Sequence, residues 1–403
     1  MVQTARAVTL PSEPISSTPT ARGPVWERPA FQWLAVVLLV YLLIVAVTLI
    51  GGGFRQAAGE RAEELFQFAT NPFMGLIIGT VSTALIQSSS TVSSIIVGLV
   101  AGGLPVSTAV PMIMGANIGT TITNTIVSLG HLADDDEFER AFAAATVHDF
   151  FNLWSVVIFL PLEIAFHPLE QIGGWLAEGM LGGSAVNMKG FDFVNTATTP
   201  LVSFFARLTD ALGDEGGGVT MIAIGVIMII STITAMGRAL KGLMVGRAKQ
   251  VLHSAIGRGA FAGIISGAII TVLVQSSSTT TSLIVPLAGA GLLTLQQIYP
   301  FTLGANIGTC ITALLAATAF TGQYAFPALQ IALVHLSYNV IGVLVIYGLP
   351  ILRSMPLRNA RALSKLAKKR KSLGLVYILT VFFVIPLVAV GVSKLSGGGP
   401  GMP

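Results

Sequence analysis

The sequence predicts an all-α polytopic membrane protein that contains two inverted-topology repeats, each with a re-entrant hairpin and broken helices. The first observation is composition, since 10% of the 403 residues are charged and 53% are hydrophobic, whereas soluble domains carry about 25% charged residues. The second is that residues 65–133 and 259–352 hold no Asp, Glu, Lys or Arg. The third is that both runs contain the same motifs in the same order. This composition excludes a soluble enzyme, a nucleic-acid-binding protein and a disordered protein.

The internal repeat emerges when the chain is aligned with itself. Residues 83–103 (TALIQSSSTVSSIIVGLVAGG) and 271–291 (TVLVQSSSTTTSLIVPLAGAG) share 12 of 21 positions at an offset of 188. GANIGTTIT at 115–123 recurs as GANIGTCIT at 304–312, at an offset of 189. A third motif, HDFFN, recurs as HLSYN at an offset of 187. Three motifs in one order at a near-constant offset define two copies of one unit.

The placement of basic residues sets the expected orientation in the membrane. Segments 238–258 and 353–371 are rich in Lys and Arg, and we expect both in the cytoplasm. Repeat 2 lies between them and therefore crosses the membrane an even number of times. Two spans meet this requirement if 260–291, which the polar QSSS interrupts, is a re-entrant hairpin that enters from the cytoplasm. Counting the spans backwards from the cytoplasmic segment 238–258 places the entry of the equivalent hairpin, 72–103, on the outside. The two repeats are therefore expected to be inverted.

In chain order, we expect six regions in a multi-pass protein of the cell (plasma or inner) membrane with a cytoplasmic N-terminus. They are a disordered tail at 1–30, the first span and a linker at 31–71, repeat 1 at 72–163, an outer loop, a span and a basic cytoplasmic loop at 164–259, repeat 2 at 260–352, and a basic loop with the last span at 353–403. A span needs about 20 apolar residues. Seven spans are therefore expected, at 31–50, 105–128, 141–160, 217–237, 296–320, 324–348 and 374–394.

The duplicated QSSS motif is the first candidate site. A Gln followed by three serines between apolar half-helices must face protein or water, because unsatisfied backbone groups are costly in hydrocarbon. The half-helix that follows presents free N–H groups and the positive end of its dipole, and serine hydroxyls donate as well. Two such ends can meet one anion, and the alternative is hydrogen bonding between transmembrane helices. The candidate anion ligands are Ser88, Ser89, Ser90, Thr91, Ser276, Ser277, Ser278 and Thr279.

The GANIGT motif is the second candidate, as a break that binds a cation. Its glycines allow the backbone to unwind, and its Asn and Thr side chains offer neutral oxygens. Sodium is a hard cation and takes oxygen ligands, as calcium and magnesium do, and the carbonyls of broken helices supply them. Small residues at a tight helix crossing are the alternative. The neutral candidates are Asn117, Thr120, Thr123, Asn306, Thr309 and Thr312, together with Gln87 and Gln275.

Asp149 is the third candidate, because it is the only formal charge between Ala141 and Leu162. A carboxylate inside a span is costly unless it is paired or meets a cation, so it indicates function. Asn152 lies three residues further on and shares a helix face with Asp149. Repeat 2 has Leu336 at the equivalent position, which predicts a cation site that exists once. The alternative is an aspartate neutralised by a partner that the sequence does not reveal.

Other kinds of chemistry are weighed and set aside. His148 and His335 lack enough neighbouring His or Cys ligands for a transition metal, so we expect none and favour hydrogen bonding for both. A hydrolase built from Ser88, His148 and Asp149 is disfavoured, because adjacent helix residues point in different directions and G-x-S-x-G is absent. We expect no enzyme, no organic cofactor and no nucleic-acid partner. The basic loops can contact the headgroups of anionic membrane lipids.

These motifs resemble those of the type II sodium–phosphate cotransporter family. The resemblance rests on the paired QSSS, on GANIGTTITNTIVSLG at 115–130 and on FERAFAAATVHDFFNLWSVVIFLPLE at 138–163. It covers residues 70–163 and 258–350, and the compact chain resembles a prokaryotic member. The resemblance implies sodium-driven uptake of inorganic phosphate, mainly the divalent form, with alternating access at the interface between the repeats.

The resemblance also implies roles for individual residues. It assigns phosphate to the two QSSS tips, one sodium ion to Gln275, Ser276, Thr309 and Thr312, and another to the region of Asp134, Asp149 and Asn152. An aspartate at position 149 matches the electrogenic members, which implies about three sodium ions per phosphate. The coupling ion is then Na+. A sodium-coupled carrier of another oxyanion, such as sulfate or arsenate, and an ion channel are the alternative functions.

Overall fold

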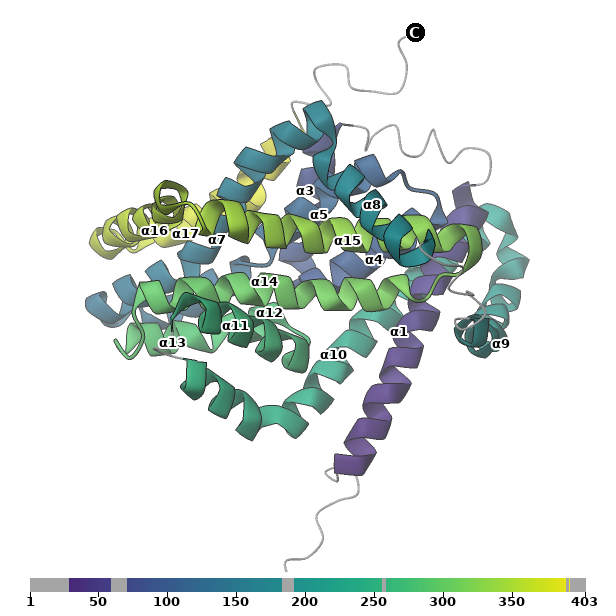
Figure 1. Ribbon diagram of the computed structural model, residues 1–403, viewed down its shortest axis with the longest axis horizontal. Helices are drawn as coiled ribbons and strands as arrows, with labels where there is room; N and C mark the ends of the chain where they lie inside the picture. Colours follow the sequence, from purple (N-terminus) through teal and green to yellow (C-terminus); the bar gives the residue numbers. More distant parts are fainter. Residues whose placement is uncertain (1–28, 59–70, 183–191, 256–258, 389–390, 392–403) are drawn as a thin grey trace, which may run out of the picture.

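The computed structural model describes residues 29–58, 71–182, 192–255, 259–388 and 391, and every regular element in these ranges is a helix. The predicted all-α fold is confirmed for this part of the chain (Figure 1). The prediction of a disordered tail at 1–30 falls almost entirely outside the described residues.

Among the described residues, five stretches of helix are long and apolar enough to cross a membrane: 31–57, 135–166, 196–239, 295–317 and 322–347. They coincide with five of the seven predicted spans. The predicted span at 105–128 is divided into two shorter helices, and the predicted span at 374–394 corresponds to a shorter apolar stretch at 372–388. The chain is therefore a polytopic membrane protein.

The hairpin of repeat 1 consists of α3 (Pro72–Ile86) and α4 (Ser89–Gly102). Asn71 caps α3, because its side chain accepts a hydrogen bond from the Phe73 N–H, and Pro72 suits the first helical turn, where an N–H has no partner. The helix ends at Gln87, whose φ of 57° lies in the left-handed region. At 15 residues, α3 is about 22 Å long, which is too short to cross a hydrocarbon core of about 30 Å.

The hairpin of repeat 2 has the same construction in α11 (Ala260–Val274), α12 (Ser277–Ser282) and α13 (Ile284–Gly289). Gln275 ends α11 with a φ of 54°. The two non-glycine residues in left-handed conformation at the hairpin tips are thus the equivalent glutamines of the two QSSS motifs.

The helices after each hairpin differ between the repeats. In repeat 1, α5 (Val106–Gly119) stops at GANIGT, and α6 (Ile122–Ser128) begins after Thr120 and Thr121. In repeat 2, α14 (Leu295–Ala317) runs through GANIGT without interruption. The prediction of a break at this motif holds for repeat 1 and is wrong for repeat 2.

Close helix crossing explains the glycines of GANIGT. A Cβ atom on Gly115 or Gly119 would collide with backbone atoms of α3, and one on Gly304 or Gly308 would collide with backbone atoms of α11. Each motif therefore lets its helix approach the first half-helix of its own hairpin, as small residues do in membrane helix packing. This role needs no unwinding, so it is compatible with the continuous α14.

The helix that carries the HDFFN or HLSYN motif is the last helix of each repeat. These helices are α7 (Asp135–Phe166) and α15 (Ala325–Gly342), and α15 is followed by a π-helix at Val343–Tyr347. In Figure 1, α14 and α15 run side by side across the middle of the molecule. The largest buried apolar cluster joins α4, α5, α14 and α15 with the first helix, α1 (Pro29–Ala58).

The remaining helices surround the two repeats. They are α8 (Pro168–Gly182), α9 (Asp192–Thr209), a short 3-10 helix at Asp210–Leu212, α10 (Gly213–Ala255), α16 (Pro350–Lys369), α17 (Ser372–Leu379) and a π-helix at Thr380–Val384. The long α10 packs along α1, and α16 packs on α7 at the opposite end of the molecule (Figure 1). Lys368 on α16 bonds Asp136 and Glu139 on α7. These hydrogen bonds and charges raise the pKa of the Lys368 ammonium group.

Candidate functional site

Each hairpin tip is built by a serine that caps the second half-helix. Ser88 Oγ accepts a hydrogen bond from the Thr91 N–H at 3.2 Å, and Ser276 Oγ accepts one from the Thr279 N–H at 3.1 Å. Such caps satisfy one of the free N–H groups of a helix N-terminus. The first serine of each motif is therefore a cap in this structure, and its hydroxyl also pairs with the threonine hydroxyl three residues later.

The second serine of each motif has a free hydroxyl. Ser89 and Ser277 are both 3% exposed, and neither hydroxyl makes a hydrogen bond within the described ranges 29–58, 71–182, 192–255 and 259–388. Ser90 is also buried, and Ser278 makes only a long contact of 3.4 Å with the Thr120 carbonyl. The hydroxyls of Ser89 and Ser277 are thus equivalent donors with capacity for a ligand.

Each tip packs against the other repeat. The α4 half-helix contacts α14 and α15, and α12 contacts α6. On the α12 side, the hydroxyls of Thr281 and Ser282 donate to Asn124 Oδ1 at 2.8 and 3.1 Å. The sequence did not single out Asn124, and the equivalent position of repeat 2 is Ala313. The two tips are therefore held in different ways.

Buried hydroxyls lie on the turn before each glutamine and in the GANIGT helices. Thr83 and Thr271 are equivalent, and each has a buried Oγ1 without a hydrogen-bond partner in the described part of the chain. In repeat 2, Thr312 Oγ1 donates to Gln275 Oε1 at 2.9 Å. Its counterpart Thr123 has an unpartnered buried hydroxyl. The structure thus brings together Gln275 and Thr312, two of the four residues expected at one sodium site.

Thr120 and Thr309 use their hydroxyls locally. Each donates to the carbonyl four residues earlier in its own helix, at 3.0 Å, to Ala116 and Ala305 respectively. Both side chains are buried. Each hydroxyl oxygen keeps lone pairs that can accept a hydrogen bond or coordinate a cation.

Asp149 is 1% exposed and lies in the middle of α7. Its Oδ2 atom accepts hydrogen bonds from Thr125 Oγ1 at 3.2 Å and from Tyr377 Oη at 3.1 Å. Its Oδ1 atom is buried and has no partner among the described residues, and no described Lys, Arg or His forms an ion pair with it. A carboxylate with only neutral donors around it is suited to a cation.

Asp134 does not lie beside Asp149. Its side chain is exposed and caps α7, because Oδ1 accepts hydrogen bonds from the N–H groups of Asp136 and Glu137 at 2.9 and 2.8 Å. Fifteen helical residues separate the two aspartates, which corresponds to about 22 Å. The structure therefore does not join them in one site.

Six side chains form a buried contact between the repeats, which we call the Asn–His seam: Asn117, His148, Asn152, Asn306, His335 and Asn339. Asn117 Nδ2 donates to Asn339 Oδ1, and Asn306 Nδ2 donates to Asn152 Oδ1, both at 2.8 Å. The Oδ1 atoms of Asn117 and Asn306 lie 3.2 and 2.7 Å from Nε2 of His335 and His148. Since an amide oxygen only accepts, both histidines donate through Nε2.

The seam affects three residues expected to bind sodium, namely Asn117, Asn152 and Asn306. Their amide groups are occupied by contacts between the repeats, and Asn152 Nδ2 also donates to the Asn117 carbonyl at 2.7 Å. The favoured hydrogen-bonding role of His148 and His335 agrees with the seam. The motif spacing gave a signal for all six residues, but it did not reveal which residues pair.

Two residues that hydrogen-bond to Asp149 lay outside the sequence prediction, namely Thr125 and Tyr377. Thr125 lies within the quoted 115–130 motif. It is part of α6, which packs against α7, the helix that carries Asp149. Tyr377 lies after both repeats, and nothing in the local sequence connects it with Asp149.

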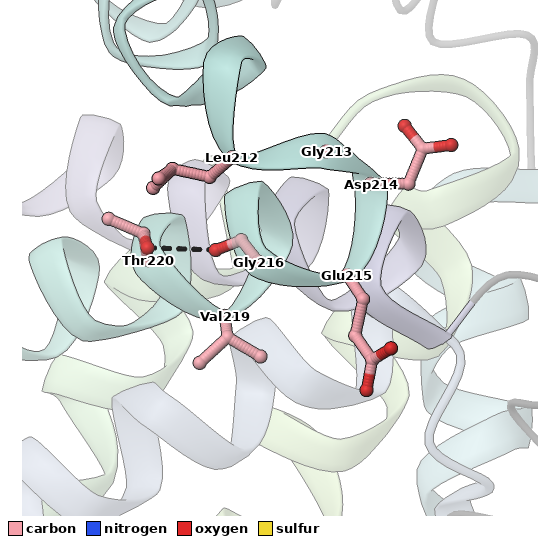
Figure 2. A pocket seen from close by; sticks show the side chains of 7 residues that line it. All are labelled: Leu212, Gly213, Asp214, Glu215, Gly216, Val219 and Thr220. Atoms are coloured by element: carbon pink, nitrogen blue, oxygen red, sulfur yellow. Dashed lines mark hydrogen bonds between the residues drawn. The ribbon is translucent and has the colours of Figure 1, made fainter.

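Two other polar features lie away from these residues. Glu163, His167 and Glu170 bring their ligand atoms within 4.8 Å of one another, but the Glu163 oxygens accept from the N–H groups of Leu169 and Glu170, which start α8. A surface pocket of about 750 Å³ lies where α10 begins. Figure 2 shows the two carboxylates of that pocket, Asp214 and Glu215, pointing in different directions. Neither feature includes a predicted ligand.

The chain matches one family profile and several transport proteins in sequence. The profile of a family described as Na+/Pi-cotransporter matches residues 42–176 and 227–353. The sodium-dependent phosphate transport protein 2A of Oryctolagus cuniculus is 34% identical over 91% of this chain and 68% of its own length. Protein 2A of Rattus norvegicus is 33% identical over 88% of this chain and 66% of its own length. Protein 2B of Homo sapiens is 32% identical over 90% of this chain and 66% of its own length.

This chain spans about two thirds of the length of these relatives. No solved structure matches the chain. The relatives are transport proteins and not enzymes. The matched segments contain both QSSS motifs, both GANIGT motifs and Asp149. The chain therefore belongs to the Na+/Pi-cotransporter family.

Proposed function

We propose that this protein is a secondary active transporter that couples the uptake of inorganic phosphate to sodium. The relatives are named as sodium-dependent phosphate transport proteins, and the matched segments cover the motifs of both repeats. The observation that carries the proposal is the set of buried, unpartnered oxygens at equivalent or motif positions: Thr83, Thr123, Asp149 and Thr271. Oxygen atoms of this kind are the ligands that a hard cation prefers.

Phosphate binds at the hairpin tips in this proposal. Ser89 and Ser277 are buried residues whose hydroxyls make no hydrogen bond in the described part of the chain, and α4 starts at the same point, so its N-terminal N–H groups add further donors. Divalent phosphate accepts several hydrogen bonds at once. Hydroxyl and N–H donors bind it without a lysine or arginine, in agreement with the uncharged run from 65 to 133.

Sodium binds beside the tips and at Asp149. Gln275 and Thr312 contact one another and supply neutral oxygens on the repeat 2 side. Asp149 supplies a negative oxygen on the repeat 1 side only, because Leu336 replaces it in repeat 2. About three sodium ions with one divalent phosphate carry one net positive charge, which makes the cycle electrogenic.

The inverted topology is part of the proposal. Arg55 Nη1 donates to the Ala101 carbonyl at 2.9 Å and its guanidinium lies 4.1 Å from the ring centre of Tyr324. Arg140 Nε donates to the Gly289 carbonyl at 2.8 Å. Ala101 and Gly289 are equivalent residues at the ends of the two hairpins, where a helix C-terminus attracts a cation.

These two arginines agree with the orientation derived from the basic loops. In that orientation Arg55, Ala101 and Tyr324 lie outside, while Arg140 and Gly289 lie in the cytoplasm. The ion pair between Lys371 and Asp135, at 2.9 Å, also joins two segments assigned to the cytoplasm. Each contact thus connects segments that the topology assigns to one side, and the hairpins end at opposite faces. Alternating access then arises from motion of one repeat against the other.

The test is uptake of labelled phosphate into proteoliposomes that contain the purified protein. Competition by unlabelled phosphate, arsenate and sulfate identifies the anion. Uptake that requires external sodium and is inhibited by unlabelled phosphate supports the proposal. Sodium-dependent uptake that only sulfate inhibits would instead show that the substrate is another oxyanion.

A further inference from the structure

The helix α17 contacts the most buried carboxylate among the described residues, that of Asp149, although α17 lies outside both repeats. Tyr377 on α17 places its hydroxyl 3.1 Å from Asp149 Oδ2. The family profile matches 42–176 and 227–353 and so does not include this residue. The repeat symmetry provides no counterpart either, since position 336 is leucine. Figure 1 shows α17 beside α7 and α16 at one end of the molecule.

The tyrosine is fixed by ring packing on α7. Its ring centre lies 6.3 Å from that of Phe142 in an edge-on arrangement and 6.1 Å from that of Phe150. Gly374, one turn earlier on α17, packs over the same Phe142 ring, where even a Cβ would make an ordinary contact at 3.4 Å. These contacts hold the ring, and the hydroxyl at its end reaches the carboxylate of Asp149, which directly precedes Phe150 on α7.

Two donors to Asp149 use the same oxygen, and the Thr121 side chain also lies beside the carboxylate. Thr125 and Tyr377 hydrogen-bond to Oδ2, and Oδ1 stays without a partner in the described residues. Two donors from two different helices fix the rotation of the carboxylate about its bond to Cβ. The oxygen left over is therefore held in one place, ready for a cation.

We propose that Tyr377 is a positioning residue of the Asp149 cation site, which orients the carboxylate so that Oδ1 receives sodium. The proposal rests on sodium as the transported cation. Tyr377 donates one hydrogen bond to a charged acceptor, and the loss of such a bond weakens the state that needs it by about tenfold or more. The helix after the repeats thereby sets the sodium affinity of a site whose carboxylate lies within repeat 1.

The experiment compares wild type with Tyr377→Phe, which keeps the ring and removes the hydroxyl. The first readout is the sodium concentration that gives half-maximal phosphate uptake, and the expected result is an increase of about tenfold. The maximal rate and the phosphate KM at saturating sodium stay within about twofold, whereas a packing defect would lower the rate at every sodium concentration.

The second readout needs no transport. Sodium chloride, compared with choline chloride, raises the thermal unfolding temperature of the detergent-solubilised protein if sodium binds the folded state. Tyr377→Phe shifts this stabilisation to higher sodium concentrations. Tyr41→Phe is the matched control, because Tyr41 also donates one hydrogen bond, to the Ala197 carbonyl at 3.0 Å, at an exposed place.

Installation of 4-aminophenylalanine or 4-fluorophenylalanine at position 377 provides a second pair of variants if Tyr377→Phe does not accumulate. The amino group restores a donor and should restore sodium affinity, whereas the fluorine should not. Unchanged sodium dependence in the variants without a donor overturns the proposal. If wild type shows sodium-dependent stabilisation but no phosphate uptake, the transport function fails while the cation site stands, so the two failures are distinguishable.

Discussion

Asn117 of repeat 1 donates a 2.8 Å hydrogen bond from Nδ2 to Oδ1 of Asn339 in repeat 2. Its symmetry mate is also present, because Asn306 donates a bond of the same length to Asn152. Exchange of the two repeats converts one bond into the other, as in a self-complementary twofold interface. The two bonds that join the repeats at the Asn–His seam are therefore equivalent.

The departures from this symmetry concern the parts expected to bind ions. Asp149 of repeat 1 is aligned with Leu336 of repeat 2, and Asn124 is aligned with Ala313. Thr312 bonds Gln275, while its counterpart Thr123 has an unpartnered hydroxyl. The hydrogen bonds of the seam are symmetric, whereas the residues expected to bind cations differ between the two repeats.

The first prediction concerns the stability that the seam provides. Asn117→Ala leaves Asn339 Oδ1 and the His335 N–H without partners, and each unsatisfied buried group costs about 1–3 kcal/mol. We expect a lower thermal unfolding temperature in detergent, and we expect Asn117→Ala and Asn339→Ala to be non-additive by at least about 0.5 kcal/mol.

The control for the seam is Asn359→Ala on α16, a half-buried residue whose side chain makes no hydrogen bond in the described part of the chain. It should change the unfolding temperature little. Strict additivity of the Asn117 and Asn339 substitutions would show that the two side chains do not depend on one another.

The second prediction concerns phosphate recognition. Ser89→Ala and Ser277→Ala each remove a buried hydroxyl that is free to bind a charged ligand, which should cost about 1.5–3 kcal/mol and raise the phosphate KM at least about tenfold. Ser354→Ala on the exposed side of α16 is the control, because its hydroxyl bonds only the Ile351 carbonyl. A normal phosphate KM in both tip variants at equal expression would remove the hydroxyls from the binding site.

The third prediction concerns charge movement. Asp149→Gly removes the carboxylate, so the third sodium ion should be lost and two sodium ions should accompany one divalent phosphate without net charge. Movement of one charge through the membrane field is worth about 2.3 kcal/mol per 100 mV. A valinomycin-imposed, inside-negative potential should therefore accelerate uptake by wild type and not by the variant.

Asp214→Gly, which removes an exposed carboxylate at the start of α10, should retain the voltage response of wild type. A voltage response that persists undiminished in Asp149→Gly would exclude Asp149 as the ligand of the third sodium ion.

The fourth prediction concerns topology. Single cysteines in place of Glu178 on α8 and Lys365 on α16, both exposed, should react with an impermeant thiol reagent from opposite sides of the membrane. The background is Cys310→Ser, since Cys310 is the only cysteine and is buried. Reaction of both positions from the same side would refute the inverted arrangement.

The sequence predicted the parts of the fold that follow from composition and self-similarity. The apolar stretches of the sequence located five helices that match candidate spans, two of them in the charge-free run 259–352, and the alignment of the repeats placed both hairpin tips at QSSS. Gln87 and Gln275 end their helices in left-handed conformation at these tips. Such features are encoded locally, because a polar stretch between apolar half-helices leaves few alternatives in a membrane.

The remaining features depend on contacts between distant segments. The same GANIGT letters lie at an interruption in repeat 1 and inside the continuous α14 in repeat 2, so the motif alone does not specify whether the helix breaks. The pairing of Asn117 with Asn339 joins residues 222 positions apart, and Tyr377 reaches Asp149 over 228 positions. No periodicity or spacing connects such residues, so their partners become known only from the fold.

Sodium-coupled accumulation of phosphate is the most direct test of the central claim. Proteoliposomes with the purified protein receive labelled phosphate under an inward sodium gradient, and a matched set receives choline in place of sodium. We expect internal phosphate to rise above the external concentration in sodium only, and to fall back when the gradient is collapsed by a sodium ionophore. Equal uptake in sodium and choline, or uptake that stops at equilibrium in sodium, would contradict sodium-coupled transport.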